Sequence, residues 1–134
     1  MKTIVYLCMC LMSFGVFAQE SEHVILSKEL FEASIHSDTE SLKRNIQLID
    51  VRRPEEFEAG KIEGATNINV LEEEGFKEQI KNLDKAQPVY IYCRSGRRSA
   101  KAAQLMLDAG FSKIFDLEGG YLNWTGESQN IEKN

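Results

Sequence analysis

Residues 89–99 read Val-Tyr-Ile-Tyr-Cys-Arg-Ser-Gly-Arg-Arg-Ser, and this stretch decides the fold. The continuous apolar run Val89–Tyr92 is typical of a strand at the centre of a parallel sheet. The spacing of apolar residues over 99–109 predicts a helix, which Gly110 ends as a left-handed cap. The stretch therefore joins the most apolar strand of the chain to its best helix, with Cys93 at the junction.

Outward from this junction, short apolar runs alternate with helical spacings. Short helices are expected from Ser27 to Ile35, from Pro54 through Phe57 to a stop at Gly60, and from Gly120 to about Trp124. A further helix is expected at 76–83 and a polar loop at 36–45. The predicted strands are 24–26, 46–51, 66–70, 89–92 and 113–117. This alternation predicts an α/β fold with a five-stranded, mainly parallel sheet flanked by helices.

The composition fits a single domain. The chain has 134 residues, of which 43% are hydrophobic and 28% are charged. These values are ordinary for a soluble globular protein, and they exclude a disordered or collagen-like chain. A packed hydrophobic core is therefore expected.

The first 18 residues are predicted to be a signal peptide. Lys2 precedes an apolar run that ends at Phe17, and small residues follow at the positions that a signal peptidase reads. The 14-residue run spans roughly 21 Å at ~1.5 Å per residue, short of the ~30 Å hydrocarbon core, which argues against a membrane anchor. We expect cleavage after Ala18, an exported protein (periplasmic or secreted), a domain at 24–126 and a polar tail at 127–134.

Maturation would leave an acidic chain with one cysteine. Without Lys2, the chain carries 15 basic and 21 acidic side chains, a net charge of −6, which disfavours nucleic acid and anionic membranes as partners. The other two cysteines leave with the signal peptide, so Cys93 has no partner for an internal disulfide. His23 and His36 are expected to be solvated. Two histidines are too few for a zinc site, and we predict no metal and no cofactor.

The loop after Cys93 has the features of an anion site. Gly96 lets the backbone bend so that several N–H groups point into one concavity at a helix N-terminus, and Arg94, Arg97 and Arg98 surround it. These groups favour the thiolate over the thiol. The alternative is a buried, inert cysteine, but arginines at the positive end of a helix are unfavourable unless an anion offsets them. We therefore expect a reactive thiol, open to solvent at the mouth of a ring of main-chain donors.

These motifs together resemble a single-domain rhodanese, over about 24–124. In family order, the resemblance is carried by Leu48-Ile49-Asp50-Val51-Arg52, Glu56-Phe57, Gly60-Lys61-Ile62-Glu63-Gly64-Ala65, Asn67-Ile68, the loop Tyr92–Ser99, Glu118-Gly119-Gly120 and Trp124. Lys61 departs from the pattern at a scaffold position where the family often has His. The resemblance implies a three-layer rhodanese fold in which Cys93 accepts a sulfane sulfur as a persulfide and the loop 93–98 cradles it.

Sulfur transfer requires a nucleophile and a means of holding the donor. A thiolate attacks the outer sulfur of a donor such as thiosulfate, sulfite leaves, and the persulfide passes its terminal sulfur to cyanide or to a thiol acceptor, for example a thioredoxin-like protein. Guanidinium groups match the paired oxygens of such a donor. Asp50 and Arg52 are expected to support the site structurally. The candidate substrate-binding residues are Arg94, Ser95, Gly96, Arg97, Arg98 and Ser99.

Two other functions remain open. The same loop would serve a carrier that receives a persulfide and passes it on without turnover of its own. Cysteine phosphatases and arsenate reductases have arginine six residues after the cysteine, where this chain has Ser99 and places Arg98 one residue too early. A shorter loop suits one sulfur atom better than a tetrahedral phosphate, so sulfur transfer is favoured over phosphate chemistry.

Overall fold

The computed structural model describes residues 20–37 and 46–127, in which five strands alternate with helices. The predicted signal peptide, most of the predicted loop 36–45 and nearly all of the predicted tail lie outside these residues. The elements are β1 (Glu22–Leu26), α1 (Lys28–Ile35), β2 (Gln47–Asp50), α3 (Pro54–Ala59), β3 (Thr66–Asn67), α4 (Glu73–Gln79), η1 (Ile80–Asn82), β4 (Val89–Tyr92), α5 (Arg97–Asp108), β5 (Lys113–Leu117) and α6 (Gly120–Thr125).

The strands form one sheet in the order β1-β5-β4-β2-β3, and every pairing in it is parallel. The apolar strand β4 lies at the centre, with Ile91 opposite Ile49 of β2 and Asp116 of β5. The expected α/β fold with a parallel five-stranded sheet is therefore confirmed. Strand β3 is shorter than the predicted 66–70, because after Asn67 the chain leaves the ladder and only its N–H groups still bond the end of β2.

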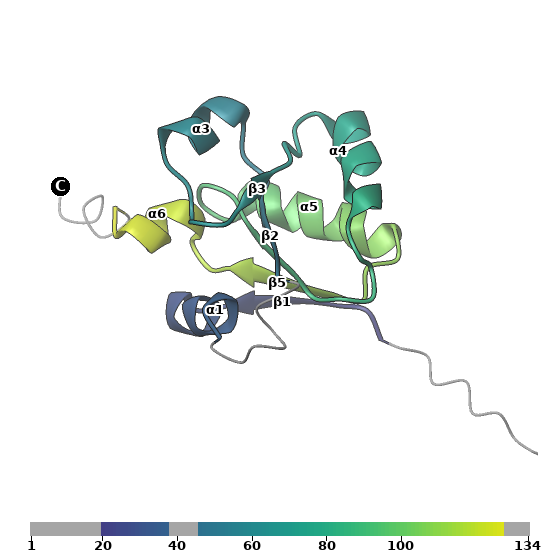
Figure 1. Ribbon diagram of the computed structural model, residues 1–134, viewed down its shortest axis with the longest axis horizontal. Coiled ribbons are helices and arrows are strands. Elements are labelled where there is room, and N and C mark those ends of the chain that lie inside the picture. The colour runs from purple at the N-terminus through teal and green to yellow at the C-terminus, as the bar shows by residue number, and fades with distance from the viewer. Residues whose placement is uncertain (1–19, 38–45, 128–134) are drawn as a thin grey trace, which may run out of the picture.

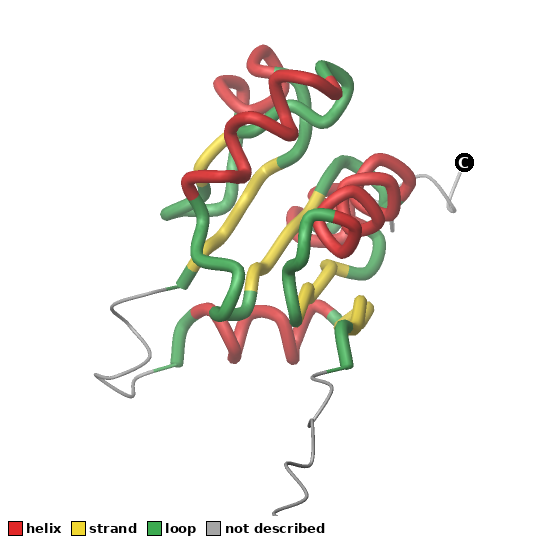
Figure 2. The backbone as a smooth tube through the Cα atoms, turned by 90° about the vertical axis from the view of Figure 1, so that its right-hand side faces the viewer, coloured by secondary structure: helices red, strands yellow, loops and turns green. Residues whose placement is uncertain are grey.

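Helices cover both faces of the sheet (Figure 1). One core packs the sheet against α4, η1 and α5, and the other packs it against α1 and α6. Figure 2 shows the strands lying between these helices. Because side chains alternate along a strand, Val89, Ile91 and Cys93 belong to the α5 core, whereas Tyr92 belongs to the α1 core.

The helix ends follow local signals in the sequence. The Ser27 side chain caps α1 by accepting from the Leu30 N–H at 3.3 Å, as predicted. Gly110 ends α5 with a φ of +97°, and the N–H of Phe111 folds back onto Met106 at 3.1 Å, which confirms the predicted cap. The predicted helix 76–83 instead divides into α4 and the 3-10 turn η1. In the described residues, no helix is both long and apolar enough to cross a membrane.

A side-chain pair ties α3 to the start of α5. The Arg98 guanidinium donates to both carboxylate oxygens of Glu56, at 2.6 Å and 2.8 Å, although the residues are 42 positions apart. Both side chains are more than two-thirds buried, so solvent screens the pair less than it would at the surface. The pair fixes the position of α3 beside the first turn of α5.

This pair should make stability depend on pH. The hydrogen bond from Arg98 lowers the pKa of Glu56 to about 2, from an ordinary value near 4.5. A carboxyl with a lowered pKa stabilises the fold above its ordinary pKa, and that contribution is lost as the pH falls through the folded value. The free energy of unfolding, measured by urea titration between about pH 5 and about pH 2, should therefore fall less in Glu56→Gln than in the wild type. Exposed Glu58→Gln is the control and should follow the wild type.

Candidate functional site

Cys93 follows β4 directly and lies beneath the first turn of α5. The Gly96 N–H points at the Cys93 sulfur, with an N–S distance of 3.0 Å. Gly96 is the N-cap of α5 and has a φ of +112°, a conformation that glycine adopts without strain. The predicted bend in the loop is therefore present. The sequence predicted several N–H groups around the sulfur. Among the described residues, the Gly96 N–H is the one within hydrogen-bond distance of the sulfur.

The expectation that the Cys93 thiol is open to solvent is wrong. Only 1% of the residue is exposed. Cys93 continues the inward alternation of Val89 and Ile91, so its side chain enters the core between the sheet and α5. For the thiol to be open to solvent, the strand would have had to end one residue earlier, so that Cys93 no longer followed its alternation. The sulfur is therefore shielded from solvent in this conformation of the loop.

The first turn of α6 holds the loop from behind. The N–H groups of Tyr121 and Leu122 donate to the carbonyls of Cys93 and Arg94, at 2.8 Å and 3.1 Å. Gly120 permits this approach, because a Cβ there would lie 2.5 Å from the Cys93 carbonyl oxygen. With both carbonyls turned toward α6, the backbone that follows is free to turn its N–H groups toward the sulfur.

Ser99 completes the floor of the loop. It is fully buried, its hydroxyl donates to the Gly96 carbonyl at 3.1 Å, and it accepts from the Cys93 thiol at 3.5 Å. Ser95, by contrast, is exposed at the outer side of the loop. The structure thus brings Cys93, Gly96 and Ser99 into direct contact.

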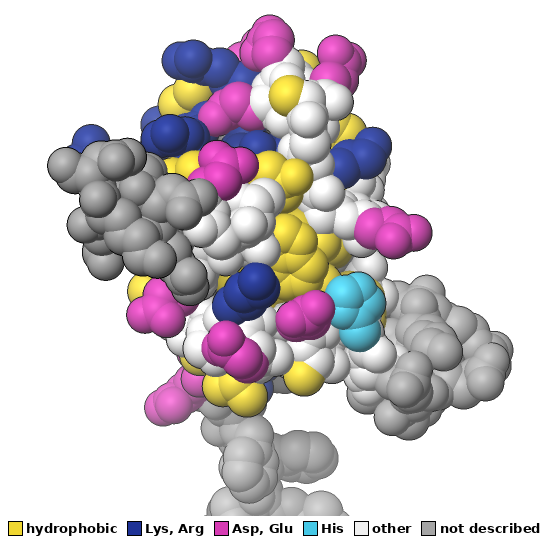
Figure 3. All heavy atoms as spheres, turned by 90° about the vertical axis from the view of Figure 1, so that its left-hand side faces the viewer, with side chains coloured by type: hydrophobic (Ala, Val, Ile, Leu, Met, Phe, Trp, Pro, Cys, Tyr) yellow, Lys and Arg dark blue, Asp and Glu magenta, His cyan; other side chains and the backbone are white. Residues whose placement is uncertain are grey.

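The three arginines of the loop have different surroundings. Arg94 and Arg97 are exposed and form no ion pair with residues of the described ranges. Arg98 is half-buried, and its hydrogen bonds to Glu56 raise the pKa of its guanidinium above the ordinary value. Figure 3 shows the side of the molecule on which α3 and α6 lie, and Lys and Arg side chains gather in its upper part, around α3. Basic side chains therefore occur on this face together with several acidic ones.

Asp50 and Arg52 form a buried pair behind the loop. The Arg52 guanidinium donates to Asp50 at 2.7 Å and to the Gly60 carbonyl at 2.6 Å, and its face lies 4.3 Å from the centre of the Tyr121 ring. The pair joins the end of β2 to the chain after α3 and to α6. A structural role for both residues remains the prediction.

Sequence reasoning missed one buried acid near the thiol. Asp116 of β5 is 3% exposed, and one of its oxygens lies 2.9 Å from the His23 ring. The prediction that His23 is solvated is wrong, because its ring pairs with this carboxylate, whereas His36 is exposed as expected. An acid within the apolar run 113–117 is the signal that could have identified Asp116.

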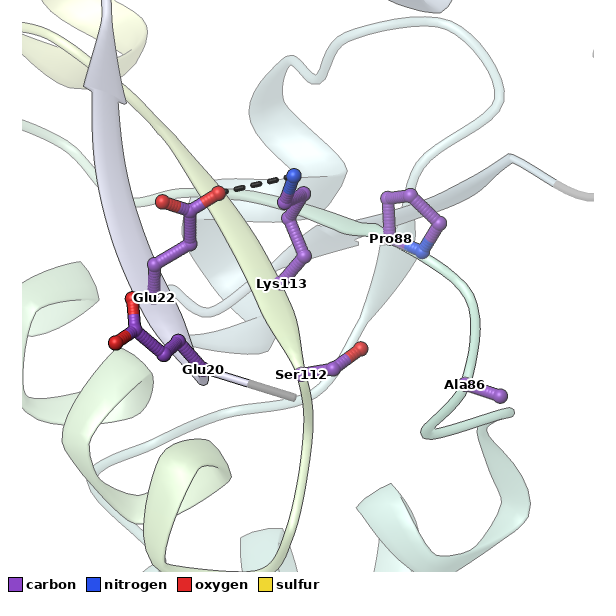
Figure 4. Close-up of a pocket in the computed structure, with 6 residues that line it drawn as sticks. All are labelled: Glu20, Glu22, Ala86, Pro88, Ser112 and Lys113. Carbon is purple, nitrogen blue, oxygen red and sulfur yellow. Dashed lines mark ion pairs between the residues drawn. The ribbon is translucent and has the colours of Figure 1, made fainter. Parts of the chain in front are cut away.

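Cavities that do not include Cys93 occur elsewhere in the described residues. A cavity of about 410 Å³ lies at the amino ends of the strands, lined in part by the ion pair Glu22–Lys113, whose N–O distance is 2.9 Å (Figure 4). Cys93 lies at the opposite ends of the strands. Within residues 20–37 and 46–127, no group of three or more His, Cys, Asp or Glu side chains is arranged to hold a metal ion.

Comparison with known proteins identifies the architecture around Cys93. The family model described as "Rhodanese-like domain" matches residues 36–127. The Bacillus subtilis protein YqhL is 45% identical over 84 residues, covering 63% of this chain, and "Putative sulfur carrier protein YrkF" of the same organism is 34% identical over 104 residues, covering 78%. The chain spans 64% and 52% of the lengths of these two relatives.

Two further likenesses agree with this match. Thiosulfate sulfurtransferase 18 of Arabidopsis thaliana is 29% identical over 113 residues, covering 76% of this chain and 83% of the relative. The crystal structure of a rhodanese-related protein from Thermoplasma volcanium superposes with a TM-score of 0.60 at 28% identity, covering 78% of this chain and 92% of the other. The family match, the parallel sheet and the loop after β4 lead to one conclusion: this chain belongs to the rhodanese-like domain family.

Proposed function

We propose that this chain is a sulfurtransferase that carries a sulfane sulfur on Cys93 as a persulfide. The observation that carries the proposal is the Gly96 N–H, which points at the Cys93 sulfur from the start of α5 at 3.0 Å. A main-chain donor at a helix N-terminus stabilises negative charge on that atom, whether it belongs to a thiolate or to a persulfide. Membership of the rhodanese-like family and the sulfur chemistry in the names of its relatives support the proposal.

The proposed reaction has two steps. The Cys93 thiolate attacks the outer sulfur of a donor such as thiosulfate; a new S–S bond forms, the S–S bond of the donor breaks, and sulfite leaves with the electron pair. Cyanide or a thiolate acceptor then attacks the terminal sulfur, which regenerates the Cys93 thiolate and releases thiocyanate or a new persulfide. The loop contributes mainly by holding the sulfur donor in line with the Cys93 sulfur, and by placing hydrogen-bond donors where negative charge collects.

The arginines divide into two roles in this proposal. Arg94 and Arg97 have exposed guanidinium groups and are assigned to the sulfonate oxygens of the donor. Arg98 is already held by both oxygens of Glu56, so its role is to fix the loop against α3 and to add positive charge near Cys93. Ser95 and Gly96 complete the wall that the donor meets.

The burial of Cys93 adds a step to this proposal. Because the residue is only 1% exposed, the loop must open before a donor or an acceptor reaches the sulfur. We also propose that the protein is exported and acts with a thiol acceptor such as a thioredoxin-like protein. In an oxidising compartment, a persulfidated resting form or recycling by such a partner would compensate for the absence of a resolving cysteine in the chain after residue 18.

A carrier without turnover is the second candidate. It is favoured by the likeness to "Putative sulfur carrier protein YrkF" and by the closed loop, which would retain a bound sulfur. Thiocyanate formation from thiosulfate and cyanide separates the two functions. A sulfurtransferase forms thiocyanate continuously, whereas a carrier forms about one per chain and then stops.

Thiosulfate treatment should add one sulfur atom to Cys93. Intact-mass spectrometry of the treated protein, with peptide mapping to locate the added sulfur, measures this directly. Cys93→Ser should gain no sulfur at this position, because an oxygen nucleophile forms no persulfide. An unmodified wild-type Cys93 would contradict the proposal. Hydrolysis of an aryl phosphate that is lost in Cys93→Ser would instead support phosphate chemistry.

The contact between α6 and the loop should be required for persulfide formation. Gly120→Ala places a Cβ against the carbonyls of Cys93 and Arg94 and displaces the loop. A displacement of this kind should slow persulfide formation by about a hundredfold.

Gly126→Ala is the matched control, because Gly126 also has a positive φ but open space beside it. Gly126→Ala should lose about 1 kcal/mol of stability, measured by urea unfolding, and Gly120→Ala should lose more because its Cβ meets the backbone of the loop. Only Gly120→Ala should lose the reaction. Equal rates in the two variants would show that the contact does not position the loop.

A further inference from the structure

The buried carboxylate of Asp116 has an unsatisfied oxygen. Its Oδ2 is paired with His23, but its Oδ1 is buried and has no hydrogen-bond partner among the described residues. Buried polar atoms in folded proteins are nearly always hydrogen-bonded, and an unpaired one needs an explanation. The reaction proposed above makes no use of this group.

The fold places Asp116 on the same face of the sheet as the thiol. Asp116 lies opposite Ile91 in the parallel ladder, and Cys93 follows Ile91 by two residues, so both side chains point to the α5 face of the sheet. The buried Ser99 reaches the same face from α5 and contacts the Cys93 sulfur. Burial raises the pKa of Asp116, while the nearby Ser99 hydroxyl and the His23 ring act in the opposite direction. Ser99 therefore lies between a buried thiol and a buried acid.

Ser99 has one proton and several acceptors. In the structure its hydroxyl donates to the Gly96 carbonyl and accepts from the Cys93 thiol. Rotation toward Asp116 would satisfy the unpaired Oδ1. Whether Ser99 can donate to the sulfur thus depends on whether Asp116 is charged.

We propose that Cys93 and Asp116 share one proton through the Ser99 hydroxyl, so that Asp116 is a positioning residue that governs when Cys93 becomes a thiolate. This inference rests on the proposed role of Cys93 as the nucleophile. Asp116 is the group that controls ionisation of this nucleophile, and neither the loop nor its arginines account for that control.

The proton transfer is balanced within the three residues. The thiol proton passes to the Ser99 oxygen as the Ser99 proton passes to Oδ1 of Asp116, so the S–H bond breaks and an O–H bond forms. Cys93 becomes a thiolate, Asp116 becomes a neutral acid and Ser99 is unchanged. The buried pair keeps a single negative charge, whereas two neighbouring negative charges would oppose each other strongly.

The charged groups around the pair are few. His23 of β1 faces Asp116, and it is the route to solvent because 22% of its side chain is exposed. Arg98 of α5 acts on Cys93 from the other side, and its charge is partly offset by Glu56 of α3. Of the two buried acids among the described residues, Asp50 pairs with Tyr92 and faces the α1 side of the sheet, whereas Asp116 shares the α5 face with Cys93.

Replacement of Asp116 by a neutral residue tests the proposal. In Asp116→Asn the pH midpoint of Cys93 ionisation should fall, and the thiolate fraction near neutral pH should rise about tenfold, the effect of removing one nearby like charge. The midpoint is measured from thiolate ultraviolet absorbance, with Cys93→Ser as the blank, and from the rate of alkylation by iodoacetamide. Asp108→Asn removes the same charge from the exposed far end of α5 and is the matched control.

A midpoint that is unchanged, raised or equal to that of Asp108→Asn would overturn the proposal. If Asp116→Asn does not fold, Asp116→Leu removes the same charge with an apolar side chain of similar volume and should shift the midpoint in the same direction. Alkylation involves no sulfur transfer, so the measurement is independent of the proposed function. A lowered midpoint in a protein that forms no persulfide would support the coupling and contradict the sulfurtransferase.

Discussion

The site depends on the contact between the first turn of α6 and the backbone of the Cys93 loop. Two N–H groups of α6 bind the carbonyls of Cys93 and Arg94, and Gly120 allows the two backbones to approach. A carbonyl and the following N–H lie in one rigid peptide plane and point in opposite directions. Fixing the carbonyls of Cys93 and Arg94 on α6 therefore orients the N–H groups of Arg94 and Ser95, and the next peptide brings the Gly96 N–H to the sulfur. Gly120 thus shapes the loop from outside it.

The site combines two opposing electrostatic influences. The start of α5 and the three arginines favour negative charge at Cys93, whereas burial and the nearby Asp116 oppose it. The ion pairs Glu56–Arg98 and Asp50–Arg52 neutralise part of the positive charge, which leaves Arg94 and Arg97 with exposed guanidinium groups. In the proposed reaction, this balance suits a thiol that attacks an anion but is otherwise shielded from solvent.

The elements set by local sequence were predicted well, and the contacts between distant residues were not. The apolar run of β4 and the caps Ser27 and Gly110 are local signals, and the structure confirms them. The alternation of Val89, Ile91 and Cys93 directs the thiol to one face of the sheet, but its burial also depends on how α5 packs over that face. The Glu56–Arg98 pair spans 42 positions and the His23–Asp116 pair 93, so their charges could be counted in the sequence but not paired.

The Gly96 amide at the sulfur has a consequence for the proposed persulfide. A second sulfur bonded to Cys93 would extend about 2 Å beyond the first. The charge would then reside on the outer atom, while the Gly96 N–H would face the inner, uncharged one. The bound sulfur would thus change which backbone N–H groups donate hydrogen bonds, and the loop would have to move outward to make room for it. If Cys93 carries a persulfide as proposed, the backbone around it would therefore differ in conformation between the free and the sulfur-bearing protein.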